Sequence, residues 1–202
     1  MKKVLILLFF ISYYAAEAQV QDSVSYTNSV TYNISYFGYN LIKPGLKAGV
    51  NFNLRNRTIE KFTTKKSGKI IDKSGEGQWL AGSAVGFFWQ PGHISVFNYY
   101  EISYKRLRSA NQTFNIVGFG PGIYRSVYPE TYEVGEDGQV QKKTLSGRTY
   151  FAPVVSFGSG KNINNPLFQS WQFCTNLMFL FDYNTGIVPL LSFELTFNFN
   201  QK

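Results

Sequence analysis

The only histidine of the chain, His93, stands two residues before Ser95, directly after Pro91 and Gly92. Residues two apart in an extended segment point to the same side, so this imidazole could act as the base that activates the Ser95 hydroxyl as a nucleophile. Such a pair also needs an acidic group to orient the imidazole, and no carboxylate is identifiable near this turn. A histidine in a turn is most often simply solvated, so we predict no catalytic residue.

Other chemistry-bearing patterns are weak. The single cysteine, Cys174, cannot form an internal disulfide, and Cys and His residues with metal-ligand spacing are missing. The glycines at 118, 120 and 122 alternate as in a strand, with no following helix to hold a phosphate. The sequence therefore predicts no metal site, no cofactor and no enzymatic activity.

The first 18 residues have the composition of an export signal. Lys2 and Lys3 precede an apolar run, and an Ala-x-Ala cleavage pattern ends at Ala18. We expect cleavage there, which leaves residues 19–202 as one domain. The formal net charge of +8 suits anionic lipid head groups or lipopolysaccharide phosphates. Because the chain carries an export signal, we do not expect this positive charge to bind a nucleic acid.

The last segment, 191–200, alternates strictly between large apolar and polar residues. Successive side chains of a strand point to opposite sides, so one face of this segment is apolar and the other is polar. This pattern is typical of a transmembrane β-strand with lipid outside and water or polar packing inside. After the export signal no apolar run is long enough for a spanning helix, so a membrane crossing requires strands.

Eight segments are long enough to cross a bilayer as tilted strands, and eight is the smallest barrel size in common use. Pro121 and Pro153 fall inside two of them and predict a bulge or kink, because proline cannot donate a ladder hydrogen bond. The fold class expected is therefore all-β, a single antiparallel up-and-down transmembrane barrel. The predicted strands are 29–39, 45–57, 78–90, 93–108, 113–126, 147–158, 168–183 and 191–200.

The same alternation places six charged side chains on the faces opposite the apolar ones. Buried charges are costly unless they are paired, so we predict a salt-bridged network that fills the lumen. A pore lined by the same groups is the less favoured alternative, since the interior of an eight-stranded barrel is just wide enough for side chains to fill. The predicted lumen network consists of Lys47, Arg55, Glu101, Lys105, Asp182 and Glu194.

Two long connections carry charge. The segment 58–77 is rich in lysine, and the sequence leaves open on which side of the membrane it lies. The segment 132–143 contains Glu133, Glu136 and Asp137, and the Asp137-Gly138 pair is a hairpin turn signal. We predict a β-ribbon that projects from the fifth and sixth strands.

The Ala-x-Ala start, the segment from Asn40 to Gly49, the residues Tyr132 to Val134 and the Phe-rich terminus resemble small eight-stranded outer-membrane β-barrel proteins of Bacteroidota type. This resemblance implies a meander with both termini in the periplasm of a Gram-negative bacterium. It carries over no catalytic residue. The group normally has longer loops outside than inside, and the long 58–77 connection departs from that pattern.

Three functions remain open from the sequence. The leading one is a non-catalytic structural or interaction protein of the cell envelope, which contacts outer-membrane lipid, lipopolysaccharide or envelope proteins through its long hairpin loops. The second is a secreted, soluble, lipocalin-like binder of an apolar ligand, which requires the apolar faces to point inward. The third is a lipid A-modifying outer-membrane enzyme that uses His93.

Overall fold

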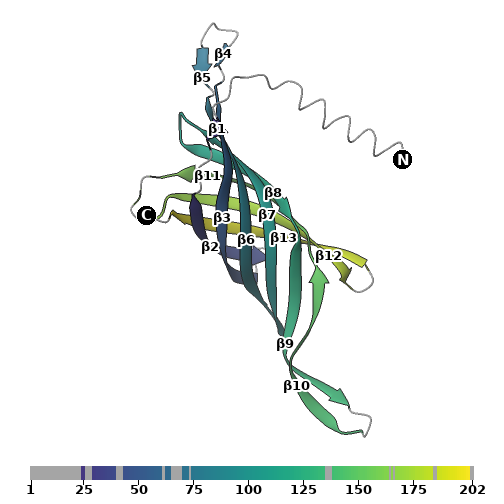
Figure 1. Ribbon diagram of the computed structural model, residues 1–202. Helices are drawn as coiled ribbons and strands as arrows, with labels where there is room; N and C mark the ends of the chain where they lie inside the picture. The colour runs from purple at the N-terminus through teal and green to yellow at the C-terminus, as the bar shows by residue number, and fades with distance from the viewer. Residues whose placement is uncertain are drawn as a thin grey trace, which may run out of the picture.

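Antiparallel pairing joins eight long strands into a closed ring (Figure 1). The computed structural model describes residues 24–25, 29–39, 43–60, 62–64, 70–72, 74–134, 138–163, 165, 167–183 and 186–200. Two of the eight barrel strands are interrupted and carry two labels each. In ring order the strands are β2 (Val30–Tyr39), β3 (Lys43–Ile59), β6 (Gly75–Gln90), β7 (His93–Arg108), β8 (Thr113–Gly120) with β9 (Gly122–Val134), β10 (Val140–Phe151) with β11 (Val154–Asn162), β12 (Ser170–Tyr183) and β13 (Gly186–Asn200).

The ring closes between its first and last strands. In the register of β2 and β13, Ile34 lies opposite Phe197. Closure removes the free sheet edges that could not be satisfied in lipid. The predicted all-β, eight-stranded antiparallel barrel is confirmed. Within the described residues, no helix is long and apolar enough to cross a membrane.

Proline interrupts two neighbouring strands at the same place. Pro121 separates β8 from β9, and Pro153 with Ala152 separates β10 from β11. The register continues across both interruptions, because Phe151 lies opposite Ile123 and Val154 opposite Gly120. The proline carbonyls still accept hydrogen bonds, from Tyr100 N at 2.9 Å and from Phe179 N at 3.0 Å. The missing proline N–H groups therefore interrupt the ladder without adding a residue to either strand.

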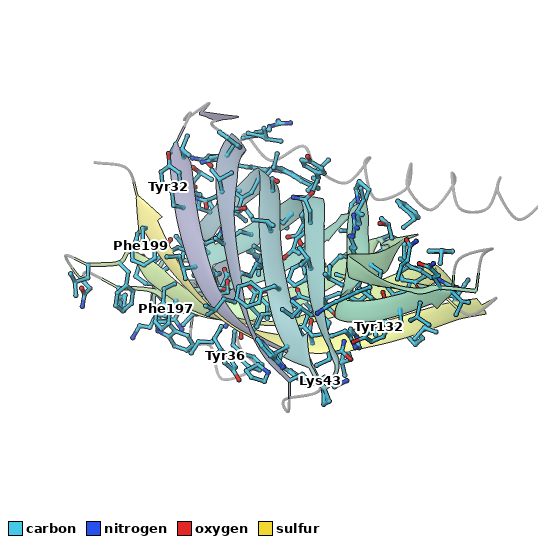
Figure 2. The ribbon with its side chains drawn as sticks, turned by 90° about the horizontal axis from the view of Figure 1, so that it is seen from below. Tyr32, Tyr36, Lys43, Tyr132, Phe197 and Phe199 are labelled. Atoms are coloured by element: carbon cyan, nitrogen blue, oxygen red, sulfur yellow. The ribbon has the colours of Figure 1, made fainter. Side chains whose placement is uncertain are left out.

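The barrel has its apolar side chains on the outside. Trp89 and Phe119 are both more than 60% exposed, whereas Ser35 and Thr196 are almost completely buried. Figure 2 shows Tyr32, Tyr36, Phe197 and Phe199 pointing away from the barrel. So much exposed apolar surface on a closed barrel fits lipid contact and not a soluble protein. The lipocalin-like alternative, which needs these faces inside, does not fit this arrangement.

The two ends of the barrel differ. At one end, here called the hairpin end, β9 and β10 continue beyond the barrel as a two-stranded hairpin (Figure 1). At that end three residues separate β2 from β3, two separate β6 from β7, and two separate β12 from β13. At the other end, here called the terminal end, lie the start of β2, the end of β13 and three short strands. These short strands are β1 (Val24–Ser25), β4 (Phe62–Thr64) and β5 (Ile70–Asp72).

The long basic connection lies at the terminal end. β4 pairs with β5 as a small hairpin between β3 and β6, and β1 pairs with the end of β3. The paired strands β4 and β5 are therefore on the same side of the barrel as the start of β2 and the end of β13. The expected signal peptide, residues 1–18, lies outside the described residues, as do all five lysines of this connection.

Candidate functional site in the barrel interior and the hairpin

A buried ion pair lies in the middle of the barrel. Lys47 Nζ is 2.5 Å from Glu194 Oε1 and donates a hydrogen bond to Tyr99 Oη at 2.7 Å. Glu194 also accepts hydrogen bonds from Ser35 Oγ at 2.7 Å, from Asn176 Nδ2 at 2.9 Å and from the Thr196 hydroxyl. Each charge is thus paired and further hydrogen-bonded, which offsets the cost of removing it from water.

Strand register brings these groups together. Ser35 on β2 lies opposite both Thr196 on β13 and Lys47 on β3, so the three residues form one inward-facing row. Glu194 is two residues from Thr196 and points to the same side. This row can form only because β13 closes the ring against β2. The pairing of Lys47 with Glu194 is thus a product of barrel closure.

A second carboxylate lies beside the ion pair. Ser156 Oγ donates a hydrogen bond to Glu101 Oε2 at 2.9 Å. A Cβ atom at Gly118 would lie 2.3 Å from Glu101 Oε1, so only glycine leaves room for this carboxylate. Glu101, Lys47 and Glu194 line a common cavity of about 40 Å³. The middle of the lumen is therefore a compact, charged cluster with space for very few water molecules.

Toward the hairpin end the lumen is filled by aromatic and aliphatic side chains, here called the aromatic plug. The rings of Phe37 and Phe97 have centroids 4.7 Å apart, and those of Phe37 and Phe88 are 5.9 Å apart. Gly86 makes room for Phe97, because a Cβ there would lie 2.4 Å from the ring. All members are less than 10% exposed, and the plug consists of Phe37, Ala84, Phe88, Phe97, Tyr99, Tyr124, Tyr150, Ala152, Val154, Met178 and Leu180.

The six charged residues predicted for the lumen separate into different groups. Lys47, Glu101 and Glu194 come together in the interior, as described above. Lys105 lines another cavity nearer the terminal end, with Nζ 4.1 Å from the centroid of the Phe114 ring. The side chain of Asp182 lies outside the described residues.

Arg55 requires a correction. The register shifts between Asn53 and Arg55, so that Leu54 is an extra residue in β3. A bulge of this kind inverts the alternation beyond it. Arg55 therefore lies opposite the exposed Trp79 and faces outward. The side chains of Asn53 and Asn56, on either side of the bulge, point inward and are joined by a 2.6 Å hydrogen bond.

The sequence analysis missed the aromatic plug. Phe37, Phe88 and Phe97 occupy inward positions of their strands, whereas the sequence pattern predicts a lumen filled by a salt-bridged network. Successive side chains alternate between the two faces, so the residues that follow the exposed Tyr36, Phe87 and Val96 point inward. That one end of the lumen is apolar could have been inferred from these positions.

His93 and Ser95 do not form a nucleophile and base pair in this structure. Ser95 Oγ is 2.6 Å from Tyr124 Oη and accepts a hydrogen bond from Gln90 Nε2 at 3.0 Å. The imidazole of His93 instead packs against the ring of Tyr128, with centroids 5.1 Å apart. The Ser95 hydroxyl is buried in a network of neutral groups, so the geometry gives the enzyme alternative no support.

The projecting hairpin carries exposed apolar side chains. Beyond the point where Val127 lies opposite Ile94 of β7, the residues of β9 pair only with β10 among the described strands. Tyr132, Val134 and Val140 are 65%, 67% and 65% exposed. Val134 lies opposite Val140, and Tyr132 is two residues away, so the three share one face. Figure 2 shows Tyr132 on this hairpin.

The side chains of the acidic residues predicted for the hairpin lie outside the described residues. The backbone of Glu133 belongs to β9, but its side chain lies outside the described residues, as do Glu136 and Asp137. The predicted β-ribbon itself is present, with paired residues from Phe151 and Ile123 to Val140 and Val134.

No protein-family model and no curated protein sequence matches this chain. Two solved structures align with most of it. One is Neisserial surface protein A, with 12% identity and a TM-score of 0.47, covering 87% of this chain and 96% of that one. The other is Ail, the attachment invasion locus protein of Yersinia pestis in complex with the heparin analogue sucrose octasulfate, with 11% identity and a TM-score of 0.35, covering 88% and 97%. At these values the barrel assignment rests on the strand pairing of this chain alone.

Proposed function

We propose that the protein is a non-conducting outer-membrane β-barrel of a Gram-negative bacterium, of the Bacteroidota type that the sequence resembles. In this proposal it is a structural or interaction protein of the cell envelope. The single observation that carries it is the arrangement of a closed barrel with an apolar exterior, a filled interior and a hairpin that extends beyond one end.

The filled interior supports the absence of conduction. The buried ion pair of Lys47 and Glu194 occupies the middle of the lumen, and the aromatic plug lies between this pair and the hairpin end. An eight-stranded barrel has little further space. Ions would have to displace both the charged cluster and the packed rings, so we assign this barrel no transport role.

The hairpin supports an interaction role. With both termini in the periplasm, the hairpin end faces the outside of the cell. Three apolar side chains, Tyr132, Val134 and Val140, are then presented to solvent on a two-stranded support. Exposed apolar groups outside the lipid-facing belt indicate binding of another molecule. We propose envelope or cell-surface proteins as its partners, while the barrel wall contacts lipid and lipopolysaccharide.

Cell fractionation and surface labelling test the location. We expect the protein in a membrane pellet that requires detergent for release, and a cysteine introduced by Gln139→Cys to react with a membrane-impermeant maleimide on intact cells. Gln112→Cys, in the turn between β7 and β8 at the terminal end, is the matched control and should react only after the outer membrane is opened. A soluble protein, or labelling of the Gln112→Cys variant alone on intact cells, would contradict the proposed location or orientation.

Crosslinking tests the interaction role. A photocrosslinker at Tyr132 should capture a partner protein, and one at Arg106, an exposed residue at the terminal end, should give a different pattern. The combined variant Val134→Ser and Val140→Ser should lose the Tyr132 adduct while the barrel stays folded. Persistence of the same adduct would show that the apolar face of the hairpin does not hold the partner.

A further inference from the structure

The terminal end of the lumen contains a polar cavity that the proposed function does not use. Its volume is about 100 Å³, and ten of its thirteen lining side chains carry a hydroxyl or an amide, which makes it a polar and nearly neutral site. These side chains come from strands around the whole ring. Those used below are Asn51, Asn53, Lys105, Asn162 and Gln172.

The cavity is closed at its inner end. Asn51 and Gln172 also line the small cavity that holds Lys47 and Glu194, so the polar space ends at the ion pair. Beyond the ion pair lies the aromatic plug. A molecule that enters from the terminal end therefore meets a pocket and not a passage.

Two buried amide oxygens in this pocket have no hydrogen-bond partner among the described residues. They are Asn53 Oδ1 and Asn162 Oδ1, and the whole of Asn53 is only 8% exposed. Asn33 Oδ1, which lines the small inner cavity, is a third such atom. Buried carbonyl oxygens are nearly always hydrogen-bonded in folded proteins. Each of these oxygens thus lacks a donor, which an occupant of the pocket has to supply.

This need for donors limits the chemistry of the occupant. A carboxylate has no proton to donate at neutral pH and a phosphate monoester has at most one, whereas each hydroxyl group both donates and accepts. Lys105 is the one charged side chain among the described lining residues, and its ammonium can donate to a hydroxyl oxygen. Each water needs about 10 to 15 Å³ of this volume, so the pocket has room for about seven to ten waters. The same space is enough for one sugar ring.

We propose that this pocket binds a neutral, hydroxyl-rich molecule of the size of a single hexose, which enters from the terminal end of the barrel. Its hydroxyl groups donate to the Asn53 and Asn162 oxygens and accept from Lys105. The proposal goes beyond the interaction role of the hairpin and does not depend on it. In the proposed orientation this ligand comes from the periplasmic side.

Saturation-transfer NMR on the detergent-solubilised barrel tests the proposal with glucose as the probe. We expect transfer to the glucose ring protons and none to tetrahydropyran, a ring of the same size without hydroxyl groups. Asn53→Leu should weaken glucose binding at least tenfold. Asn98→Leu is the matched control, because Asn98 lies opposite the exposed Val85 and Ile123 and faces outward, and it should leave binding unchanged.

Heat-modifiable mobility on gels shows whether each variant is folded. If Asn53→Leu does not fold, Asn162→Ala removes the other oxygen without a hydrogen-bond partner. This variant should also weaken glucose binding. No transfer to glucose would mean that the pocket holds water only and would overturn the proposal. Equal transfer to tetrahydropyran, or unchanged glucose binding in the folded variants, would also overturn it. A barrel without residues 130–143 should still bind glucose, which separates this result from any failure of the proposed hairpin role.

Discussion

Replacing Lys47 with methionine should destabilise the barrel strongly, because it leaves the Glu194 carboxylate buried without its counter-ion. Methionine has nearly the same length and is apolar, so the change removes the charge and little volume. Breaking a buried ion pair by removing one partner typically costs about 3 to 5 kcal/mol. Glu194 would keep its hydrogen bonds from Ser35, Asn176 and Thr196. We therefore expect the lower part of that range, about 3 kcal/mol.

The reciprocal change should cost more. In Glu194→Leu, Lys47 keeps only its hydrogen bond to Tyr99 Oη at 2.7 Å, and the donors from three other side chains lose their acceptor. We expect about 5 kcal/mol for this variant. The combined variant Lys47→Met and Glu194→Leu removes both charges of the pair, and the Ser35 and Thr196 hydroxyls, 2.9 Å apart, still satisfy one another. Its cost should be about 2 kcal/mol, well below the sum of the two single changes.

Urea unfolding of the barrel refolded into phospholipid vesicles measures these differences, with tryptophan fluorescence as the signal. Asn51→Leu, at an inward position of the same strand as Lys47 but without a charge, is the control and should cost about 1 kcal/mol. The reasoning is refuted if Lys47→Met costs less than about 1 kcal/mol, or if the effects of the two single changes simply add in the combined variant.

Three other outcomes follow from the geometry. Val50→Arg places a charge on the outer face near the middle of β3 and should reduce the free energy of insertion by about 2 to 4 kcal/mol, which vesicle refolding yields measure; equal tolerance of Val50→Arg and Asn51→Leu would contradict the assigned faces. Deletion of residues 130–143 should leave a heat-modifiable, folded barrel, since this part of the hairpin pairs only with itself among the described strands, and loss of the folded band would show otherwise. Phe88→Ala with Phe97→Ala should open the aromatic plug and produce conductance in planar bilayers, whereas the unchanged protein should give none; a silent double variant would place the barrier to ions elsewhere.

Much of the barrel follows from local pattern. Each predicted strand corresponds to a barrel strand, and 93–108 agrees with β7 in both bounds. This success has a simple cause, because lipid outside and packed groups inside impose the same alternation on every strand. The interruptions of the ladder at Pro121 and Pro153 could likewise be predicted from sequence alone, since proline lacks the N–H group that the ladder needs.

The candidate site was only partly predictable. Alternation identified Lys47, Glu101 and Glu194 as inward, but it also placed Arg55 inside, because one extra residue at Leu54 inverts the faces without a glycine or proline to mark it. The aromatic plug was missed because its inward phenylalanines adjoin outward apolar residues, such as Phe97 beside Val96, so a contrast between apolar and polar residues does not mark the two faces there. The position of Phe97 depends on the space that Gly86 leaves on the neighbouring strand.

The sequence by itself determined the strands, most of their faces and the expectation that a small barrel crosses a membrane. The tertiary structure alone decided which side chains meet across the lumen. Lys47 and Glu194 are far apart in the chain and become partners because β13 pairs with β2 in a register that aligns Thr196, Ser35 and Lys47. Period-two alternation is a local property of one strand, whereas register and closure depend on contacts between strands distant in sequence, and no single segment contains that information.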